Sequence, residues 1–141
     1  MDFDQFIALV EKKKEKSPVL FGLGHDDIPF MKDICQFEEF SGICLPEDHK
    51  KLLLKYGGGY FGFANLYSLD KKSQFYIVKN NTFPLGDYLN IGDNGCGDYY
   101  ALAIENHICR DEIYILEHGC AAAEETGFLN LFDYLLNIGL N

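Results

Sequence analysis

The amino-acid sequence predicts an α+β protein with a mainly antiparallel central sheet, flanked by N-terminal helices and a C-terminal helix. Apolar residues recur at helical spacing in three segments of the first 56 residues and again near the end of the chain. The segments between them are rich in β-branched and aromatic residues and are separated by turn residues. Helices that lie at both ends of the chain, rather than alternating with strands, favour an antiparallel sheet.

The length and the composition indicate one folded domain, which we expect to comprise residues 1–141. Of the 141 residues, 48% are hydrophobic, which is enough for a core. The five cysteines include no C-x-x-C pair, so neither a disulfide framework nor a zinc site is indicated. The N-terminus lacks the features of a secretion signal, and no apolar run approaches about 18 residues. We therefore expect a cytoplasmic protein without membrane association or cofactor.

The first helix is expected to begin after Asp2, whose side chain can cap it, and to end before Pro18. Lysines in its last turns complement the helix dipole, which explains them without a nucleic-acid site. A second helix is expected near Met31, with Asp26 and Asp27 as capping residues.

A third helix is expected to have Pro46 in its first turn and to end at the glycine run 57–59, where one glycine can form a left-handed C-cap. Thr126 is expected to cap the last helix, which has apolar residues on one face. Five segments between these helices are expected to be strands: residues 60–67, 74–78, 89–91, 99–104 and 112–116.

The net negative charge is concentrated in the second half of the chain, where basic residues are nearly absent. Residues 1–80 contain 12 acidic residues and 11 lysines, whereas residues 81–141 contain 10 acidic residues and a single base, Arg110. The net charge of -10 repels the phosphate backbone of DNA or RNA, so direct nucleic-acid binding is disfavoured. The negative electrostatic field of this charge favours a basic protein partner, although an acidic surface can also serve solubility alone.

The glycine-rich loop 92–98 contains Asp93 and Asp98, a spacing that resembles part of a calcium-binding loop. An EF-hand loop requires acidic residues at alternating positions and a glutamate at its twelfth, but here these later positions hold glycines and an isoleucine. We therefore predict a turn whose aspartates accept backbone N–H groups, and no metal site.

Two groups of residues resemble parts of a catalytic site. Cys96 with His107 or His118 would pair a thiol with a base, but nothing in the local sequence supports that pairing. Other acid/base candidates have the composition of a solvated loop: Glu117, His118, Glu124 and Glu125. No hydrolase, kinase or nucleotide-binding signature is present. We therefore predict no catalytic residues, and hence a protein that is not an enzyme.

Four motifs follow one another along the chain. They are a Leu-Pro helix start with a glycine run at the helix end, a glycine-rich loop entering a strand, a strand before an acid-histidine pair, and a closing helix: Leu45–Gly59, Ile91–Tyr100, Ile113–His118 and Phe128–Leu136. This ordered set resembles the SUKH superfamily, which includes fungal cell-wall regulators and bacterial toxin-immunity proteins. The similarity covers roughly residues 25–137.

The resemblance implies a non-catalytic binding protein, most similar to the bacterial immunity-type members. Such a protein binds and neutralises a cognate polymorphic toxin domain, for example a nuclease, inside the producing cell. The acidic half of the chain agrees with a basic toxin domain as the partner. A regulatory or scaffold protein of the same fold without a toxin partner is the alternative, and a small hydrolase or metal enzyme is a more distant one. The toxin and the oligomeric state stay open.

The residues that match the family motifs are expected mainly to shape turns: Pro46, Gly57, Gly58, Gly59, Gly92, Gly95 and Gly97. For partner contacts we expect exposed acidic residues and tyrosines near the turns: Asp93, Asp98, Tyr99, Tyr100, Glu105 and Asp111.

Overall fold

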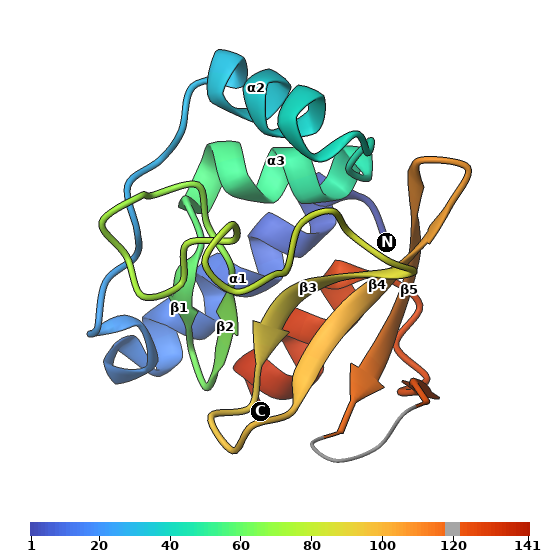
Figure 1. Ribbon diagram of the computed structural model, residues 1–141. Helices are drawn as coiled ribbons and strands as arrows, with labels where there is room; N and C mark the ends of the chain where they lie inside the picture. The colour runs from blue at the N-terminus through green and yellow to red at the C-terminus, as the bar shows by residue number, and fades with distance from the viewer. Residues whose placement is uncertain (118–121) are drawn as a thin grey trace.

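The structure is a computed structural model that describes residues 1–117 and 122–141. It confirms the α+β prediction (Figure 1). The helices are α1 (Phe3–Lys16), the 3-10 helix η1 (Pro18–Phe21), α2 (Met31–Ser41), α3 (Glu47–Tyr56), α4 (Leu131–Tyr134) and the π-helical η2 (Leu135–Gly139). The strands are β1 (Gly59–Phe61), β2 (Ala64–Leu66), β3 (Tyr88–Asp93), β4 (Tyr99–Glu105), β5 (Ile108–Leu116) and β6 (Glu124–Glu125). Within the described residues, no helix has the length and apolar character needed to cross a membrane.

Strands β3, β4, β5 and β6 form one antiparallel sheet in that order, and β1 pairs with β2 in a separate hairpin. Leu89, Leu102 and Ile113 lie opposite one another on β3, β4 and β5, and each is at most 1% exposed. Their shared face is therefore the inner face of the sheet. In Figure 1 the C-terminal helical segment lies behind the sheet, whose other face is turned toward the viewer.

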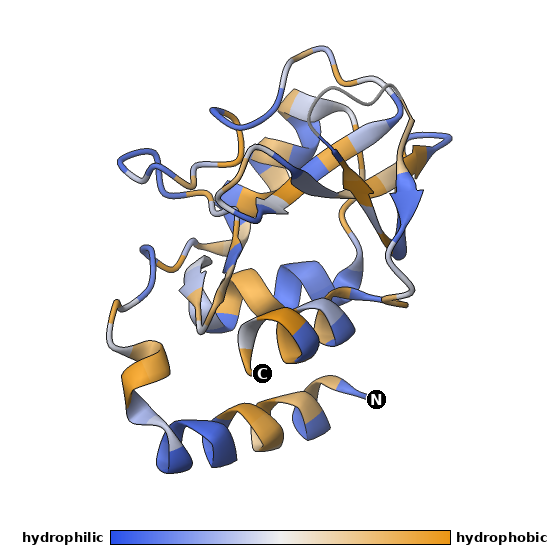
Figure 2. Ribbon diagram, turned by 90° about the horizontal axis from the view of Figure 1, so that it is seen from below, coloured by the Kyte–Doolittle hydropathy of each residue, from blue (hydrophilic) through white to orange (hydrophobic). Residues whose placement is uncertain are grey.

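The core joins the two ends of the chain. The ring of Phe6 on α1 stacks on Phe132 of α4 at 4.7 Å and on Phe61 of β1 at 6.0 Å between centroids. Tyr134 packs against Tyr100 on the inner face of the sheet at 4.8 Å. Figure 2 shows hydrophobic residues along the C-terminal helix and the middle of α1, whereas the lysine-rich end of α1 is hydrophilic.

The predicted cap of the first helix is confirmed. The Asp2 carboxylate accepts the N–H of Gln5 at 2.8 Å, and the Gln5 side chain accepts the N–H of Asp2 at 3.0 Å. Two other capping predictions are wrong. Helix α2 begins after Phe30, whose N–H donates to the Asp33 carboxylate at 2.8 Å. Helix α4 is capped by Asn130.

The residues that were expected to be caps make tertiary contacts instead. The Asp26 carboxylate accepts the hydroxyl of Ser68 at 2.6 Å, and Asp27 forms an ion pair with Lys72 at 3.1 Å. The hydroxyl of Thr126 donates to the carbonyl of Ile113 on β5 at 2.7 Å. These partners are distant in sequence, so local patterns do not reveal them.

Two strand predictions are wrong. The expected strand 60–67 is a hairpin, because the chain turns at Gly62, which has a φ of 60°. The carbonyl of Gly139 lies against Gly62 and accepts the N–H of Phe63 at 2.8 Å. The expected strand 74–78 forms turns and contributes only an isolated bridge to Ser68.

Side chains replace the missing ladder in residues 74–78. The amide of Asn80 donates to the carbonyls of Gln74 and Tyr76, at 3.0 and 2.8 Å, and the Ser73 hydroxyl accepts the N–H of Phe75 at 2.9 Å. Asparagine and serine offer the backbone such local partners, which compete with strand pairing.

Candidate partner-binding surface

The acidic residues of the second half of the chain gather on the four-stranded sheet. Apart from Asp133, those described lie on β3 to β6 or directly beside these strands. The exposed ones are Asp87, Glu105, Asp111, Glu112, Glu117, Glu124 and Glu125. The acidic half of the sequence therefore corresponds to one part of the fold, the four-stranded sheet.

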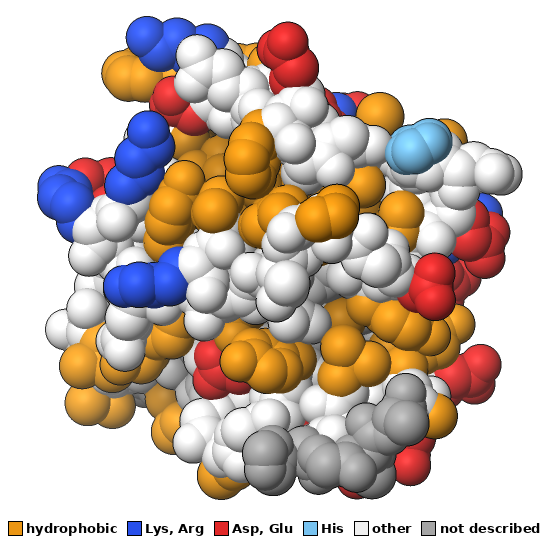
Figure 3. Space-filling model, in the orientation of Figure 1, with side chains coloured by type: hydrophobic (Ala, Val, Ile, Leu, Met, Phe, Trp, Pro, Cys, Tyr) orange, Lys and Arg blue, Asp and Glu red, His pale blue; other side chains and the backbone are white. Residues whose placement is uncertain are grey.

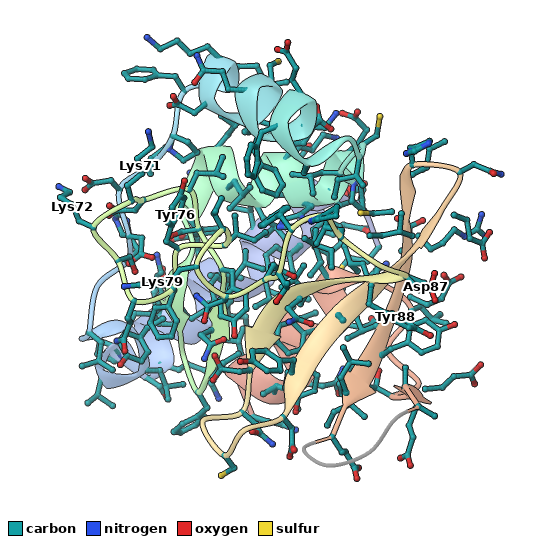
Figure 4. The ribbon with its side chains drawn as sticks, in the orientation of Figure 1. Lys71, Lys72, Tyr76, Lys79, Asp87 and Tyr88 are labelled. Carbon is teal, nitrogen blue, oxygen red and sulfur yellow. The ribbon has the colours of Figure 1, made fainter. Side chains whose placement is uncertain are left out.

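Three lysines lie on the side of the molecule away from the start of β3, as seen in Figure 4. In Figure 4, Lys71, Lys72 and Lys79 lie at the left, on the segment between β2 and β3, whereas Asp87 and Tyr88 lie at the right, where β3 begins. In Figure 3 the blue side chains lie mainly at the left and upper left, with some red ones beside them, the side chains at the right edge are mainly red, and hydrophobic side chains lie between. On this face the lysines thus lie at one side, among acidic residues such as Asp27, which pairs with Lys72, whereas the charged side chains of the other side are mostly acidic.

The outer face of the sheet has tyrosines above small residues. Asn90, Ala101, Tyr114 and Glu125 lie opposite one another on β3, β4, β5 and β6. The ring of Tyr114 approaches that of Tyr88 at 5.6 Å between centroids. The small side chain of Ala101 on β4, which lies between β3 and β5, leaves room for the two rings to meet above the sheet.

Asp93 supports the sheet from within. Its carboxylate accepts the hydroxyl of Tyr67 at 2.7 Å and the side-chain amide of Asn65 at 3.3 Å, and its N–H donates to the Asn65 side chain at 2.8 Å. Burial raises the pKa of Tyr67, and the hydrogen bond to Asp93 and its charge raise it further. The side chain of Asp93 therefore joins β2 to β3.

The glycine beside this aspartate lets a second tyrosine approach. The Tyr134 hydroxyl donates to the carbonyl of Asn65 at 2.7 Å. A Cβ on Gly92 would lie 2.6 Å from the Tyr134 hydroxyl oxygen and 2.7 Å from the Asn65 carbonyl oxygen. Only glycine fits at this position, although its φ is not positive.

The β3–β4 loop is a tight turn. Asp93 accepts the N–H of Gly95 at 2.9 Å, Asn94 accepts the N–H of Cys96 at 2.8 Å, and the Asn94 amide donates to Asp98 at 2.8 Å. Gly95 and Gly97 have φ values of 76° and 94°. Asp93 thus accepts a backbone N–H within the turn, as predicted, whereas the Asp98 carboxylate accepts a side-chain amide.

The six residues expected to contact a partner lie in two groups at opposite ends of β4. Asp93, Asp98 and Tyr99 are at the turn end, where Tyr99 is 36% exposed, while Tyr100 faces the core and is 8% exposed. Glu105 and Asp111 are exposed at the other end, where Glu105 lies 4.0 Å from Arg110. The structure does not bring the six together, and their role in binding stays a prediction.

The glycine run 57–59 accommodates the segment that precedes α2. The three residues have φ values of 80°, 89° and 85°, and Gly57 is the C-cap of α3. The N–H of Asp26 donates to the carbonyl of Gly58 at 3.0 Å, and a Cβ on Gly59 would lie 2.8 Å from the Asp26 carboxylate. Pro46 is the N-cap of α3, one residue before the first turn where it was expected.

The pairing of the Cys96 thiol with the His107 imidazole does not have the required geometry. Cys96 precedes β4 and His107 follows it, so a strand of seven residues, about 23 Å at roughly 3.3 Å per residue, separates them. His118 lies outside the described residues. Glu117, Glu124 and Glu125 are exposed. Within residues 1–117 and 122–141, no three His, Cys, Asp or Glu side chains are grouped as a metal site.

Sequence reasoning missed the residues that form the outer face, above all Tyr88, Glu112 and Tyr114. Glu112 and Tyr114 flank the buried Ile113 on β5, and an apolar residue between two more polar ones is a signal that was present in the sequence. The register that sets Tyr114 beside Glu125 and near Tyr88 comes from long-range pairing. It could not be derived from local patterns.

The sequence model of the SMI1 / KNR4 family (SUKH-1) matches residues 31–135. This match covers most of the chain, including α2, α3 and strands β1 to β6. The chain therefore belongs to the SMI1 / KNR4 family (SUKH-1), and the expected SUKH membership is confirmed. No curated protein matches the sequence.

Proposed function

We propose that this protein is a non-catalytic binding protein, and that it acts as an immunity protein that neutralises a basic toxin domain in the cytoplasm of the producing cell. Its family includes proteins of the toxin-immunity and regulator types. The observation that carries the proposal is the concentration of exposed acidic residues on one sheet, which provides a binding region for a basic protein.

Charge supports this choice of partner. Apart from Arg110, which lies near Glu105, the region of residues 81–141 contains no lysine or arginine to neutralise its carboxylates. A toxin that acts on nucleic acid has a basic cleft, and an acidic surface both attracts that cleft and excludes its substrate.

The non-catalytic role is supported by what the polar groups of the region do. The carboxylate of Asp93 is occupied by Tyr67 and Asn65, and Asp98 is held by Asn94. Within residues 1–117 and 122–141, the exposed carboxylates belong to the strands and turns of the sheet, and no hydrogen-bonded pair of nucleophile and base lies among them.

Co-expression tests the function. Cells that express the toxic domain encoded beside this gene should recover growth when this protein is co-expressed, and the two proteins should co-elute from an affinity column. An unrelated acidic protein of similar size and net charge serves as the control and should not protect. Failure to co-elute and to protect would contradict the immunity role. Capture of a cellular regulatory protein, with no toxin gene nearby, would favour the scaffold alternative instead.

A further inference from the structure

A small hollow lies beside the outer face of the sheet, between β5 and the segment that follows β6. Its volume is about 140 Å³, and its lining includes Glu112, Tyr114, Glu125, Phe128 and Leu129. Glu112 and Glu125 are exposed, and Leu129 is 68% exposed. Two carboxylates and an aromatic ring thus surround an apolar depression.

The geometry of the sheet fixes these groups. Tyr114 lies directly opposite Glu125 on β6, and Glu112 precedes the buried Ile113, next to the point where the pairing of β4 with β5 shifts register. All three side chains line the hollow. The segment after β6 is held to β5, because the N–H of Ile113 donates to the carbonyl of Phe128 at 3.0 Å. The hollow is therefore preformed by backbone pairing.

Within the described part of the chain, no cationic side chain forms an ion pair with the two carboxylates of the hollow. The ion pairs among the described residues include neither Glu112 nor Glu125, and the one base of this half, Arg110, lies beside Glu105. A neutral or anionic side chain would leave these two charges unpaired on binding. A cation would pair with both.

We propose that this hollow receives an arginine side chain of the basic protein partner, a conclusion that rests on the proposed function. Arginine suits the lining better than lysine, because its planar guanidinium stacks on an aromatic ring while donating to carboxylates, and because it is more weakly hydrated. The ring is Tyr114, the carboxylates are those of Glu112 and Glu125, and Phe128 and Leu129 contact the aliphatic stem.

A peptide titration tests the site without the partner. The probe is a five-residue peptide with a central arginine between glycine and serine residues, and the same peptide with citrulline is the neutral comparison. We expect the arginine peptide to shift the amide NMR signals of residues 112–114 and 125–129, and the citrulline peptide to leave them unchanged. Shifts centred elsewhere, or equal shifts with citrulline, would overturn the proposal.

Two double variants of equal charge provide the decisive comparison. Glu112→Gln with Glu125→Gln removes both carboxylates of the hollow, whereas Glu105→Gln with Asp111→Asn removes two exposed acids outside it. The first pair should raise the Kd of the arginine peptide about tenfold, and the second less than about twofold. If both double variants raised the Kd by a similar factor, the effect would be due to net charge alone and the proposal would be wrong. Unchanged melting temperatures verify that both variants fold.

The outcome for the function is separable. If the toxin domain binds wild type and the Glu112/Glu125 double variant equally well, the arginine site is wrong and the immunity role stands. If the arginine peptide binds in the hollow but no toxin is neutralised, the site stands and the immunity role is wrong.

Discussion

His49 is a titratable residue that is fully buried. It lies on α3 with no exposed surface, and neither ring nitrogen has a hydrogen-bond partner among the described residues. Burial lowers its pKa from the ordinary value of 6.5 to about 4. In the folded protein the imidazole is therefore neutral at pH 7, as a hydrophobic side chain would be.

This shift predicts a loss of stability in mild acid. Between pH 6.5 and about pH 4, His49 is protonated in the unfolded chain but still neutral in the folded protein. Because the unfolded state binds more protons there, the free energy of unfolding falls as the pH decreases through this range. At about 1.4 kcal/mol per pH unit, the loss at pH 5 is about 2 kcal/mol. Urea unfolding at pH 7 and pH 5 measures it. His49→Leu should lose about 2 kcal/mol less than wild type, whereas the exposed control His25→Gln should retain the full dependence. Equal pH dependence in wild type and His49→Leu would contradict the prediction.

Two buried tyrosine hydroxyls should respond oppositely to removal. The hydroxyl of Tyr56 has no partner among the described residues, and burial raises its pKa to about 12. The hydroxyl of Tyr67 donates to Asp93. Tyr56→Phe should change the free energy of unfolding by no more than about 0.5 kcal/mol or stabilise the protein, while Tyr67→Phe should cost about 1–3 kcal/mol, because it removes a donor from a half-buried carboxylate. Denaturant unfolding of both variants decides, and equal losses would refute this assignment.

At the scale of elements, Gly92 on β3 should be intolerant of any side chain. Gly92→Ala places a Cβ against Tyr134 and the Asn65 carbonyl, and it should cost about 2 kcal/mol or more through overpacking. Gly86 is the matched control, because it also lacks a positive φ and a Cβ added there would have no atom within 4 Å. Gly86→Ala should be neutral or slightly stabilising. Thermal melting compares the two, and a tolerated Gly92→Ala would show that β2 and β3 can separate without cost.

The elements that sequence patterns predicted well are those with strong local signals. The Asp2 cap, the glycine C-cap of α3 and the β-branched and aromatic segment 112–116 of strand β5 were all visible in short windows. The segment 74–78 has the composition of a strand, but local bonds from Asn80 and Ser73 stabilise turns instead. Composition indicates which secondary structure a segment favours, but it does not show which backbone groups the neighbouring side chains can reach.

The candidate surface was predictable only in part for the same reason. The excess of acidic residues in residues 81–141 predicted the charge of the sheet. The availability of each residue depended on packing, since Tyr100 turns toward Tyr134 and Asp93 toward Tyr67. The pairing of β5 with β6, which forms the hollow beside Tyr114, is a tertiary feature.

For the whole molecule, the acidic sheet predicts salt-sensitive association with the proposed toxin domain. Raising the salt concentration from about 50 to 500 mM shortens the range of electrostatic attraction, so the association rate should fall markedly while the dissociation rate changes less. Stopped-flow mixing measures both rates. Reversal of exposed acids such as Glu105→Lys and Asp111→Lys should slow association and weaken neutralisation without unfolding the protein.

Variants on the other side of the molecule provide the control. Lys71→Gln with Lys79→Gln should leave association unchanged or accelerate it, because these lysines lie away from the acidic sheet (Figure 4). A salt-insensitive complex, or charge-reversed variants that protect cells as well as wild type, would leave the acidity with a role in solubility only. The contact would then be assigned to the tyrosines around Tyr60 and Tyr99.

The stacking of Phe6 on Phe132 has a consequence for synthesis of the protein in the cell. Because α1 and Phe61 are synthesised well before α4, the apolar side of α1 is only partly covered until Phe132 emerges. A chain interrupted before residue 132 retains the acidic strands but lacks this part of the core, and cellular proteases should remove it. For the proposed immunity role, protection then follows the number of chains translated past α4, and the timing of their synthesis relative to the toxin becomes part of how the cell survives.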